Sequence, residues 1–350
     1  MSKRQRVRVS ILARPDTSAS MLLGLYDVFN FVGIGWETNV AGTPAKSLFD
    51  VKIVAASREP FQCASGVPVT PQADLEEAGE PDVAIVPGLV TTVRAPPTYR
   101  DERELNWLSH QQARGALVAS ACTGALVLAQ SEMLDGWEAT THWAWGDLFR
   151  VHYPKVKLRL EKHLCASGPN NQIVTSGGAS AWQELALHLI MRFCGLEHAV
   201  RAARYWVIPV QEGFQSPYSA PSRAVSEDDR IVRDCQVWIA NNYSETNPVS
   251  KMAQMSGLQR ATFARRFRRA TGYHPMEYVH VLRVEEAKEM LERSDHAIDE
   301  IGRDIGYEDS ASFRRLFKRM TRLTPAEYRR RFGKPRFERY ELGSYQVSKP

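Results

Sequence analysis

One cysteine stands where a thiol could act as a nucleophile. Cys122 follows the apolar run 117–120 and precedes Gly124, and small residues flank it in the stretch ASACTGA. A strand that ends in such a turn and leads into a helix has the layout of a nucleophile elbow. The helix N-terminus would favour the thiolate, and its free N–H groups could bind an oxyanion. The pattern indicates a chemical or ligand site at Cys122, with His142 following on a polar turn.

A second group of residues suited to chemistry lies in the region 249–332, which contains two copies of one pattern. Gly257 and Gly306 align at an offset of 49 residues, and after one inserted residue the offset becomes 50. At that offset the following pairs match: Phe263 and Phe313, Phe267 and Phe317, Thr271 and Thr321, Pro275 and Pro325, Tyr278 and Tyr328. In each copy, an apolar-periodic segment stops near the glycine and a second helical segment follows. This order predicts two helix-turn-helix units.

The second helix of each unit is predicted to bury its two Phe and to expose a basic face. That face carries a small residue, a hydroxyl and three cations in both copies: Ala261, Thr262, Arg265, Arg268 and Arg269, then Ala311, Ser312, Arg315, Lys318 and Arg319. A small residue allows close approach to base edges, Arg can form two hydrogen bonds to guanine, and the remaining cations can bind phosphates. The alternative is an ordinary solvated face, and the matching second copy argues against it.

The doubled unit resembles the DNA-binding domain of the AraC/XylS family of bacterial transcription regulators. The resemblance covers about 229–332 and is strongest in AIDEIGRDIGYEDSASFRRLFKRMTRLTPAEYRRR. In this family a long helix joins the two units, and the segment 276–291 matches it. A helix of about 16 residues spans roughly 24 Å, so the two recognition helices are expected to reach successive major grooves on one side of the duplex.

The elements that must position Cys122 alternate between β and α patterns. Apolar, β-branched runs at 7–13, 49–55, 83–86 and 117–120 are each followed by small residues, Gly or Pro, which is typical of buried parallel strands. Helical patterns at 21–32 and 102–114 lie between them, and IVTSGGASAWQELALHLI adds a strand, a Gly turn and a helix. This predicts a doubly wound α/β sheet, flavodoxin-like, with sites at the carboxyl ends of its strands.

Residues 7–209 resemble the ThiJ/PfpI superfamily, within the group of GlxA-like regulators that fuse such a domain to an AraC/XylS domain. The matching positions are Asp27 in GLYDVFNF, Gly88 in DVAIVPG, Cys122 and Thr123 in ACTG, and His142 in ATTHW. In enzymes of the superfamily the cysteine is the nucleophile, beside an acidic residue of the first helix and often a histidine. In the fused regulators the same pocket is taken as a ligand sensor. The resemblance therefore implies that these five residues bind a ligand, with no catalytic residue.

The sequence departs from the superfamily pattern after the third strand, where Gly88-Leu89 replaces the frequent Gly-Gly. This departure puts an intact oxyanion hole in doubt. Each site residue also has a structural alternative. Cys122 could be a buried small hydrophobe, His142 a structural histidine, and Asp27 an exposed helix residue, although its apolar neighbours would make an unpaired carboxylate costly.

Composition limits the class of protein further. The net charge of +5 arises in residues 229–333, where 20 Lys and Arg face 15 Asp and Glu, while the remainder balances. Such a surplus is expected of a domain that displaces counterions from DNA. No run approaches 18 apolar residues and no cleavable apolar segment is recognised, so a cytoplasmic protein without membrane contact is expected. Five scattered cysteines without a CxxC pair argue against disulfides and structural zinc; no metal or cofactor is expected.

The chain is expected to contain a ligand-sensing domain at 1–212, a linker rich in Ser, Pro and Gly at 213–228, a DNA-binding domain at 229–333 and a tail at 334–350. These observations predict a transcription regulator that binds double-stranded promoter DNA as a homodimer and responds to a small-molecule effector. RNA polymerase is a candidate further partner. The alternatives are a cysteine-elbow enzyme, a hydrolase or hydratase, with a DNA-binding tail, and an architectural DNA binder with an inert first domain.

Overall fold

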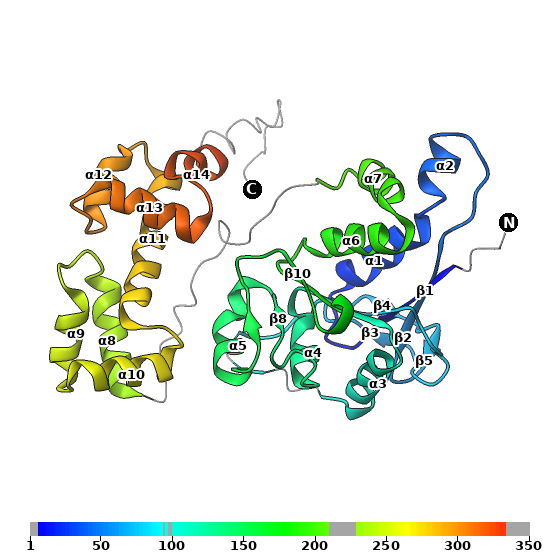
Figure 1. Cartoon of the computed structure of the whole chain (residues 1–350), viewed down its shortest axis with the longest axis horizontal. Helices are drawn as coiled ribbons and strands as arrows, with labels where there is room; N and C mark the ends of the chain where they lie inside the picture. The colour runs from blue at the N-terminus through cyan, green and yellow to red at the C-terminus, as the bar shows by residue number, and fades with distance from the viewer. Residues whose placement is uncertain (1–5, 94, 97–99, 210–228, 334–350) are drawn as a thin grey trace, which may run out of the picture. The chain divides into compact units, whose positions relative to one another are not determined.

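The computed structural model describes residues 6–93, 95–96, 100–209 and 229–333 (Figure 1). The chain folds as two compact units, Met1–Gln215 and Ser216–Pro350. We refer to them as the amino-terminal and carboxyl-terminal domains and describe each by itself. The expected linker at 213–228 and the tail at 334–350 lie outside the described residues.

A seven-stranded sheet forms the centre of the amino-terminal domain. Its spatial order is β10-β11-β7-β6-β1-β2-β5. The strands are β1 (Val7–Leu12), β2 (Phe49–Ala55), β5 (Ala73–Asp74), β6 (Val83–Val86), β7 (Leu117–Ala121), β10 (Leu164–Ser167) and β11 (Ile173–Ser176). All neighbouring strands are parallel except β10, which runs antiparallel to β11. Two small sheets, β3 (Phe61–Gln62) with β4 (Pro68–Val69) and β8 (Glu138–Ala139) with β9 (Lys157–Leu158), lie outside it.

Helices cover both faces of this sheet, because its central strands are apolar on both sides. Every residue of β6 and β7 is buried, as parallel strands in doubly wound folds require. One face packs on α1 (Ala19–Phe31), α6 (Trp182–Cys194) and α7 (Leu196–Tyr205), with α2 (Gly35–Asn39) against α7. The other face packs on α3 (Glu102–Ala113), α4 (Ala125–Gln130) and α5 (Gly146–His152). The predicted flavodoxin-like α/β architecture is confirmed.

The carboxyl-terminal domain is helical throughout its described part. Its helices are α8 (Arg230–Asn241), α9 (Pro248–Ser256), α10 (Arg260–Thr271), α11 (Pro275–Arg293), α12 (Ile298–Asp304), α13 (Ser310–Thr321) and α14 (Pro325–Phe332). The pairs α9 with α10 and α12 with α13 are the two predicted helix-turn-helix units. The long helix expected at 276–291 is α11, which runs one or two residues further at each end.

The two helix-turn-helix units repeat the same internal contacts. The ring centroids of Phe263 and Phe267 are 5.5 Å apart, and those of Phe313 and Phe317 are 5.7 Å apart. In each unit the second Phe meets a tyrosine edge-on at 5.5 Å, which is Tyr278 in the first unit and Tyr328 in the second. The repeated residue types therefore mark repeated packing, and each unit has an apolar cluster of its own.

Candidate functional site

The backbone at Cys122 has the strained geometry of an elbow. Cys122 has a φ of 54°, a left-handed conformation that is uncommon for a residue with a side chain. It begins a short 3₁₀ turn, Cys122–Gly124, that leads from β7 into α4. A Cβ atom on Gly124 would lie 2.3 Å from the carbonyl oxygen of Val86. The turn therefore requires glycine at 124, because β6 passes directly against it.

Gly88, at the end of the neighbouring strand β6, makes room for a methionine beside the cysteine. A Cβ atom on Gly88 would lie 2.4 Å from Met21 Sδ and 3.2 Å from Cys122 Cβ. Met21 lies in the first turns of α1 and is itself buried. The structure thus brings Gly88 and Cys122 together, as the sequence predicted, and adds Met21, whose role sequence reasoning missed.

The Thr123 hydroxyl forms hydrogen bonds to both backbone polar groups of Leu89, its N–H and its C=O. Its Oγ1 accepts from Leu89 N at 2.6 Å and donates to Leu89 O at 2.7 Å. The N–H of Leu89, which follows Gly88, therefore already has a hydrogen-bond acceptor. This hydrogen bond agrees with the expectation, drawn from the Gly88-Leu89 pair, that the oxyanion hole is not intact.

The thiol of Cys122 differs from the sequence expectation of a thiolate favoured by the helix N-terminus. Its residue is only 4% exposed. Burial raises the pKa of Cys122 to about 11, and this effect outweighs the hydrogen bonds from Thr123 that favour the thiolate. The helix N-terminus does not compensate, because the apolar surroundings remove the charged form from water. The thiol is therefore neutral at ordinary pH.

His142 is connected to the Cys122 turn through its neighbour Thr141. Thr141 Oγ1 donates to the carbonyl oxygen of Cys122 at 3.0 Å, so the turn before His142 is attached to the cysteine turn. The His142 ring is half-buried between Trp143 and Trp145, with centroids 5.1 Å away in both cases. Its Nδ1 accepts from the backbone N–H of Ala144 at 3.2 Å, and burial lowers the pKa of His142. The histidine is neutral, and one of its two nitrogens already holds the turn.

Asp27 is not part of this group. Its side chain is exposed on α1, whereas Met21, Leu25 and Val28 form the buried side of the helix. Asp27 also follows Met21 by six residues, about 9 Å along the helix axis. The placement matches the alternative considered for Asp27, an exposed helix residue, and does not support a role beside Cys122.

Arg14, a buried arginine near the same edge of the sheet, was not predicted from the sequence. Arg14 follows β1 and is 1% exposed. Its Nε lies 3.0 Å from Asp16 Oδ1, and its Nη1 lies 3.4 Å from Glu104 Oε2 on α3. The backbone of Asp16 in turn accepts from Val90 N at 2.7 Å. Arg14 thus connects the end of β1 to α3, and the loss of Glu104 would leave an uncompensated buried charge.

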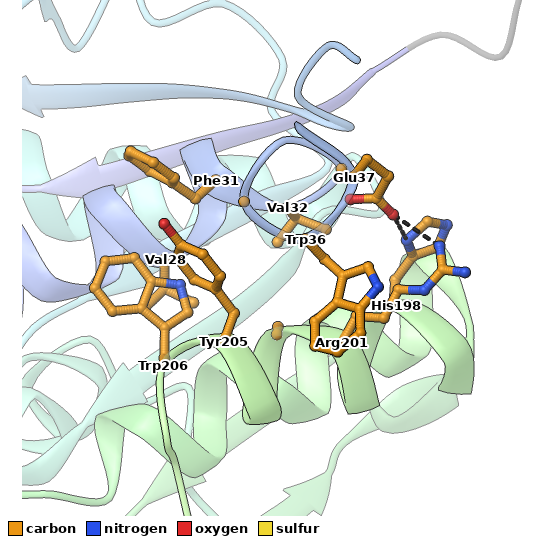
Figure 2. A pocket seen from close by; sticks show the side chains of 12 residues that line it. Val28, Phe31, Val32, Trp36, Glu37, His198, Arg201, Tyr205 and Trp206 are labelled. Carbon is orange, nitrogen blue, oxygen red and sulfur yellow. Dashed lines mark hydrogen bonds and ion pairs between the residues drawn. The ribbon is translucent and has the colours of Figure 1, made fainter. Parts of the chain in front are cut away.

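Two crevices lie away from Cys122. Figure 2 shows the first, between the end of α1, α2 and α7, where the rings of Phe31, Tyr205 and Trp206 lie against one another and Trp36 adds a further ring to the lining. Glu37 accepts from Arg201 Nη1 at 2.8 Å at its rim. The free volume is about 10 Å³, roughly the minimum for one water. In this conformation the crevice is too small for a metabolite.

The second crevice, about 310 Å³, lies at the amino-terminal edge of the sheet. Its charged groups are satisfied by protein partners: Arg8 lies 3.4 Å from Asp82, Arg114 pairs with Glu80, and Arg192 donates to the carbonyl oxygens of Asn170 and Asn171. Ligands of doubly wound domains bind at the opposite, carboxyl edge of the sheet. Cys122, at the end of β7, lies at that carboxyl edge.

The predicted DNA-binding residues lie on the outer faces of α10 and α13. All ten are exposed except Ser312, which is half-buried. Within the described residues, no hydrogen bond or ion pair joins Arg265, Arg268 or Arg269 to another side chain. Arg266 and Arg314, which the prediction omitted, instead pair with Asp229 at 2.7 Å and Asp299 at 2.7 Å. Arg266 and Arg314 thus have acidic partners in the domain, whereas Arg265, Arg268 and Arg269 face outward.

Metal-binding clusters and membrane-spanning helices are both missing from the part of the chain that the structure describes. It contains no group of three or more His, Cys, Asp or Glu residues that could hold a metal ion. None of its helices combines the length and apolar composition that a membrane span requires.

Comparison with known proteins decides the family. The model of the DJ-1/PfpI family matches residues 8–192, more than half of the chain. The chain belongs to the DJ-1/PfpI family. A helix-turn-helix domain model matches residues 252–331, which include the second unit and the first unit from within α9 onward. The resemblance stated from the sequence, a ThiJ/PfpI domain joined to an AraC/XylS domain, is confirmed.

Three relatives match different shares of this chain. The HTH-type transcriptional regulator CdhR of Pseudomonas aeruginosa is 25% identical over 88% of this chain and 90% of its own length. The regulator GlxA of Rhizobium meliloti is 25% identical over 75% of this chain and 79% of its own. Isonitrile hydratase of Pseudomonas putida is 28% identical over 63% of this chain and 88% of its own. The two regulators extend across both domains, whereas the similarity to the hydratase covers a smaller part of the chain.

Proposed function

We propose that this chain is a transcription regulator in which the DJ-1/PfpI domain binds a small-molecule effector and the helix-turn-helix domain binds promoter DNA. The observation that carries the proposal is the pair of matching basic faces on α10 and α13, in one chain with a DJ-1/PfpI domain. Regulators that align across both domains support it. We further propose that the protein acts in the cytoplasm as a homodimer.

On the DNA side, Arg265 and Arg315 are the proposed base readers, because each lies one helical turn after a small residue near the start of its helix. The cations at 268, 269, 318 and 319 follow at the carboxyl end of the helices and are proposed phosphate contacts. A gel-shift series tests the whole proposal. The full chain should enrich one sequence from random 40-base-pair duplexes, and a chain that enriches none would refute specific DNA binding.

On the sensor side, we propose that the effector binds at the carboxyl edge of the sheet, against Gly88, Cys122, Thr123 and His142. The cysteine is closed off in this structure, so the effector needs Met21 to move from its place beside Gly88. Methionine suits this role because its unbranched side chain adapts readily. Asp27 is not included, since its side chain is exposed on another face of α1.

The site supports binding better than catalysis. A cysteine nucleophile acts as the thiolate, and the Cys122 thiol has its pKa raised to about 11. Oxyanion donors are also required, and the N–H of Leu89 is bonded to Thr123. We therefore propose that Cys122 is a binding residue in an elbow that has lost its catalytic use.

An enzyme remains the second candidate, and two observations favour it: the left-handed backbone at Cys122 and the 28% identity to a hydratase. Cys122→Ser separates the candidates. In a sensor, the variant should retain DNA binding without effector and change the effector response. Turnover of a substrate by the wild type at ordinary enzymatic rates, abolished by the same substitution, would establish the enzyme instead.

The effector can be sought by thermal shift of the full chain against a set of small metabolites. A ligand that binds only the folded state raises its stability by RT ln(1 + [L]/Kd). Compounds that raise the melting temperature of the wild type but not of Cys122→Ser would be assigned to the proposed site. Compounds that act equally on both would bind elsewhere.

A further inference from the structure

The long helix α11 serves both helix-turn-helix units, and the change from one to the other occurs at an arginine. Its first half packs into the first apolar cluster through Tyr278, Val279 and Leu282. Its second half packs into the second cluster, beginning with Val284. Arg283 lies between the two sets and is only 5% exposed. A buried cation at the junction of two cores calls for a physical explanation.

The guanidinium of Arg283 is satisfied by backbone carbonyls from both units. Its Nε donates to Tyr243 O at 2.7 Å and its Nη2 to Glu245 O at 2.9 Å, both in the segment that links α8 to α9. Its Nη1 donates to Gly306 O at 3.1 Å, in the turn between α12 and α13. The Tyr307 ring covers its face, with 4.9 Å from Cζ to the ring centroid. One side chain therefore joins the first unit to the second.

Gly306 allows this junction to close. It has a φ of 88°, and a Cβ atom there would lie 2.4 Å from Ser244 O and 2.8 Å from Arg283 Nη2. The α8–α9 segment and the α12–α13 turn therefore approach through bare backbone. The side chain of Tyr243 packs against both apolar clusters at the same place. The two units meet in a fixed contact and are not joined by the helix alone.

We propose that Arg283 is a positioning residue that sets the spacing and relative orientation of the two recognition helices, α10 and α13. The turn that it holds at Gly306 leads into α13 four residues later, so a displaced turn would displace that helix. Arginine is required because its rigid fork of donors bonds three carbonyls at once, whereas the single ammonium of lysine does not. This inference rests on the proposed function, in which both helices bind one duplex.

The experiment compares full-length wild type with Arg283→Lys and Arg283→Met on the duplex that the wild type enriches from random 40-base-pair DNA. Derivatives of this duplex carry one or two base pairs inserted or removed between the two contacted subsites, which are located by footprinting. The wild type should prefer one spacing. At that spacing the variants should lose about tenfold in affinity, the loss expected for a broken charged hydrogen bond. On duplexes with altered spacing their affinity should equal that of the wild type, so that their spacing profile is flatter.

Arg293→Met is the matched control, because Arg293 lies on the same helix with its side chain 76% exposed. It should keep the wild-type spacing profile. Gly306→Ala, which crowds the same junction, should flatten the profile as the Arg283 variants do.

A positioning role and a merely stabilising role of Arg283 lead to different results. A lower melting temperature with an unchanged spacing profile in Arg283→Lys would make Arg283 a stabilising residue only and overturn the proposal. If Arg283→Met fails to fold, Arg283→Lys and Gly306→Ala decide the question by the same profile. A wild type that enriches no duplex would instead refute the proposed function.

Discussion

The carboxylate of Asp309 lies 3.6 Å from the guanidinium of Arg315, measured from Oδ2 to Nη2, at the start of α13. Ser312 bridges them, since its hydroxyl donates to Asp309 Oδ2 at 2.6 Å and accepts from Arg315 Nη2 at 2.9 Å. Asp309 also caps the helix by accepting from the N–H groups of Ala311 and Ser312. The first unit has Gln259 at the corresponding position and no side-chain cap. Arg315 is therefore oriented before DNA arrives, and Arg265 is not.

Asp309→Asn should lower the discrimination between DNA sequences while leaving the fold intact. Asparagine caps helices as well as aspartate does, but the neutral amide no longer attracts Arg315 or repels phosphates. We expect tighter binding to scrambled DNA and a smaller ratio of specific to non-specific affinity, measured by gel shift. Asp309→Ala, which also removes the cap, should in addition lose about 0.5–2 kcal/mol of stability. An unchanged ratio in Asp309→Asn would show that the carboxylate has no part in recognition.

Arg265→Ala and Arg315→Ala should each weaken binding to the selected duplex by about 1–3 kcal/mol, because base contacts carry sequence information. Arg269→Ala and Arg319→Ala should weaken selected and scrambled duplexes alike and reduce the salt dependence of binding, because phosphate contacts release counterions. Gel shifts at two salt concentrations on both duplexes measure these effects. Equal losses on both duplexes for the first pair would reassign those arginines to the phosphates.

Two glycines near Cys122 should respond differently to alanine. Gly124→Ala places a methyl group against the backbone of Val86 and Pro87, which cannot yield, so a loss of about 1–3 kcal/mol or more is expected. Gly88→Ala meets Met21 Sδ, the flexible part of a side chain, and should cost less in stability while altering effector binding. Denaturant melts and effector titrations test the pair. Equal destabilisation by both would contradict the proposed mobility of Met21.

The Cys122 thiol should resist alkylation at neutral pH. Its pKa is raised to about 11 by burial, so the folded state holds the proton more tightly than the unfolded chain does. Its contribution to stability is present below the unfolded pKa of about 8.5 and is lost as the pH rises toward 11. Peptide mapping after iodoacetamide treatment between pH 7 and about 10 should show the half-buried Cys194 modified before Cys122. Prior modification of Cys122 at pH 7 would indicate an open, activated thiol.

The amino-terminal domain should account for dimer formation, as two-fold assemblies are common among soluble proteins. Sedimentation of a fragment ending at residue 212 is expected to give a dimer at micromolar concentration. The full chain should give the same stoichiometry. A fragment that remains monomeric while the full chain dimerises would move the interface to residues 213–350.

The sequence predicted those parts of the molecule that depend on local pattern. The run at 83–86 consists of β-branched or small apolar residues and the run at 117–120 of Leu, Val and two small residues, so their assignment as buried strands needed no knowledge of neighbours. The edge strand β10 escaped because only two of its four residues are buried. Two-residue strands such as β5 have no periodicity to detect.

In the candidate site, too, the features set by local sequence were predictable and those set by long-range contacts were not. The turn at Cys122 was predictable, because small residues and a glycine must stand where a strand meets a helix closely. The burial of the thiol was not, because it depends on packing between segments that are distant in the sequence, such as Met21 and Cys122 in one apolar cluster. Asp27 was expected at the site from its match to the superfamily motif, whereas its side chain is exposed on α1.

The two domains differ in how far apart in the sequence their contacting residues lie, and this difference affects how fast each domain folds. The sheet pairs Val9 with Val83 and Val118 with Ile173, contacts that close long loops. The helical clusters use residues 232–282 and 284–332, which are close in the chain. Topologies rich in local contacts fold faster. We therefore expect the carboxyl-terminal domain to refold faster than the amino-terminal domain after dilution from denaturant, so that DNA binding returns before the effector response.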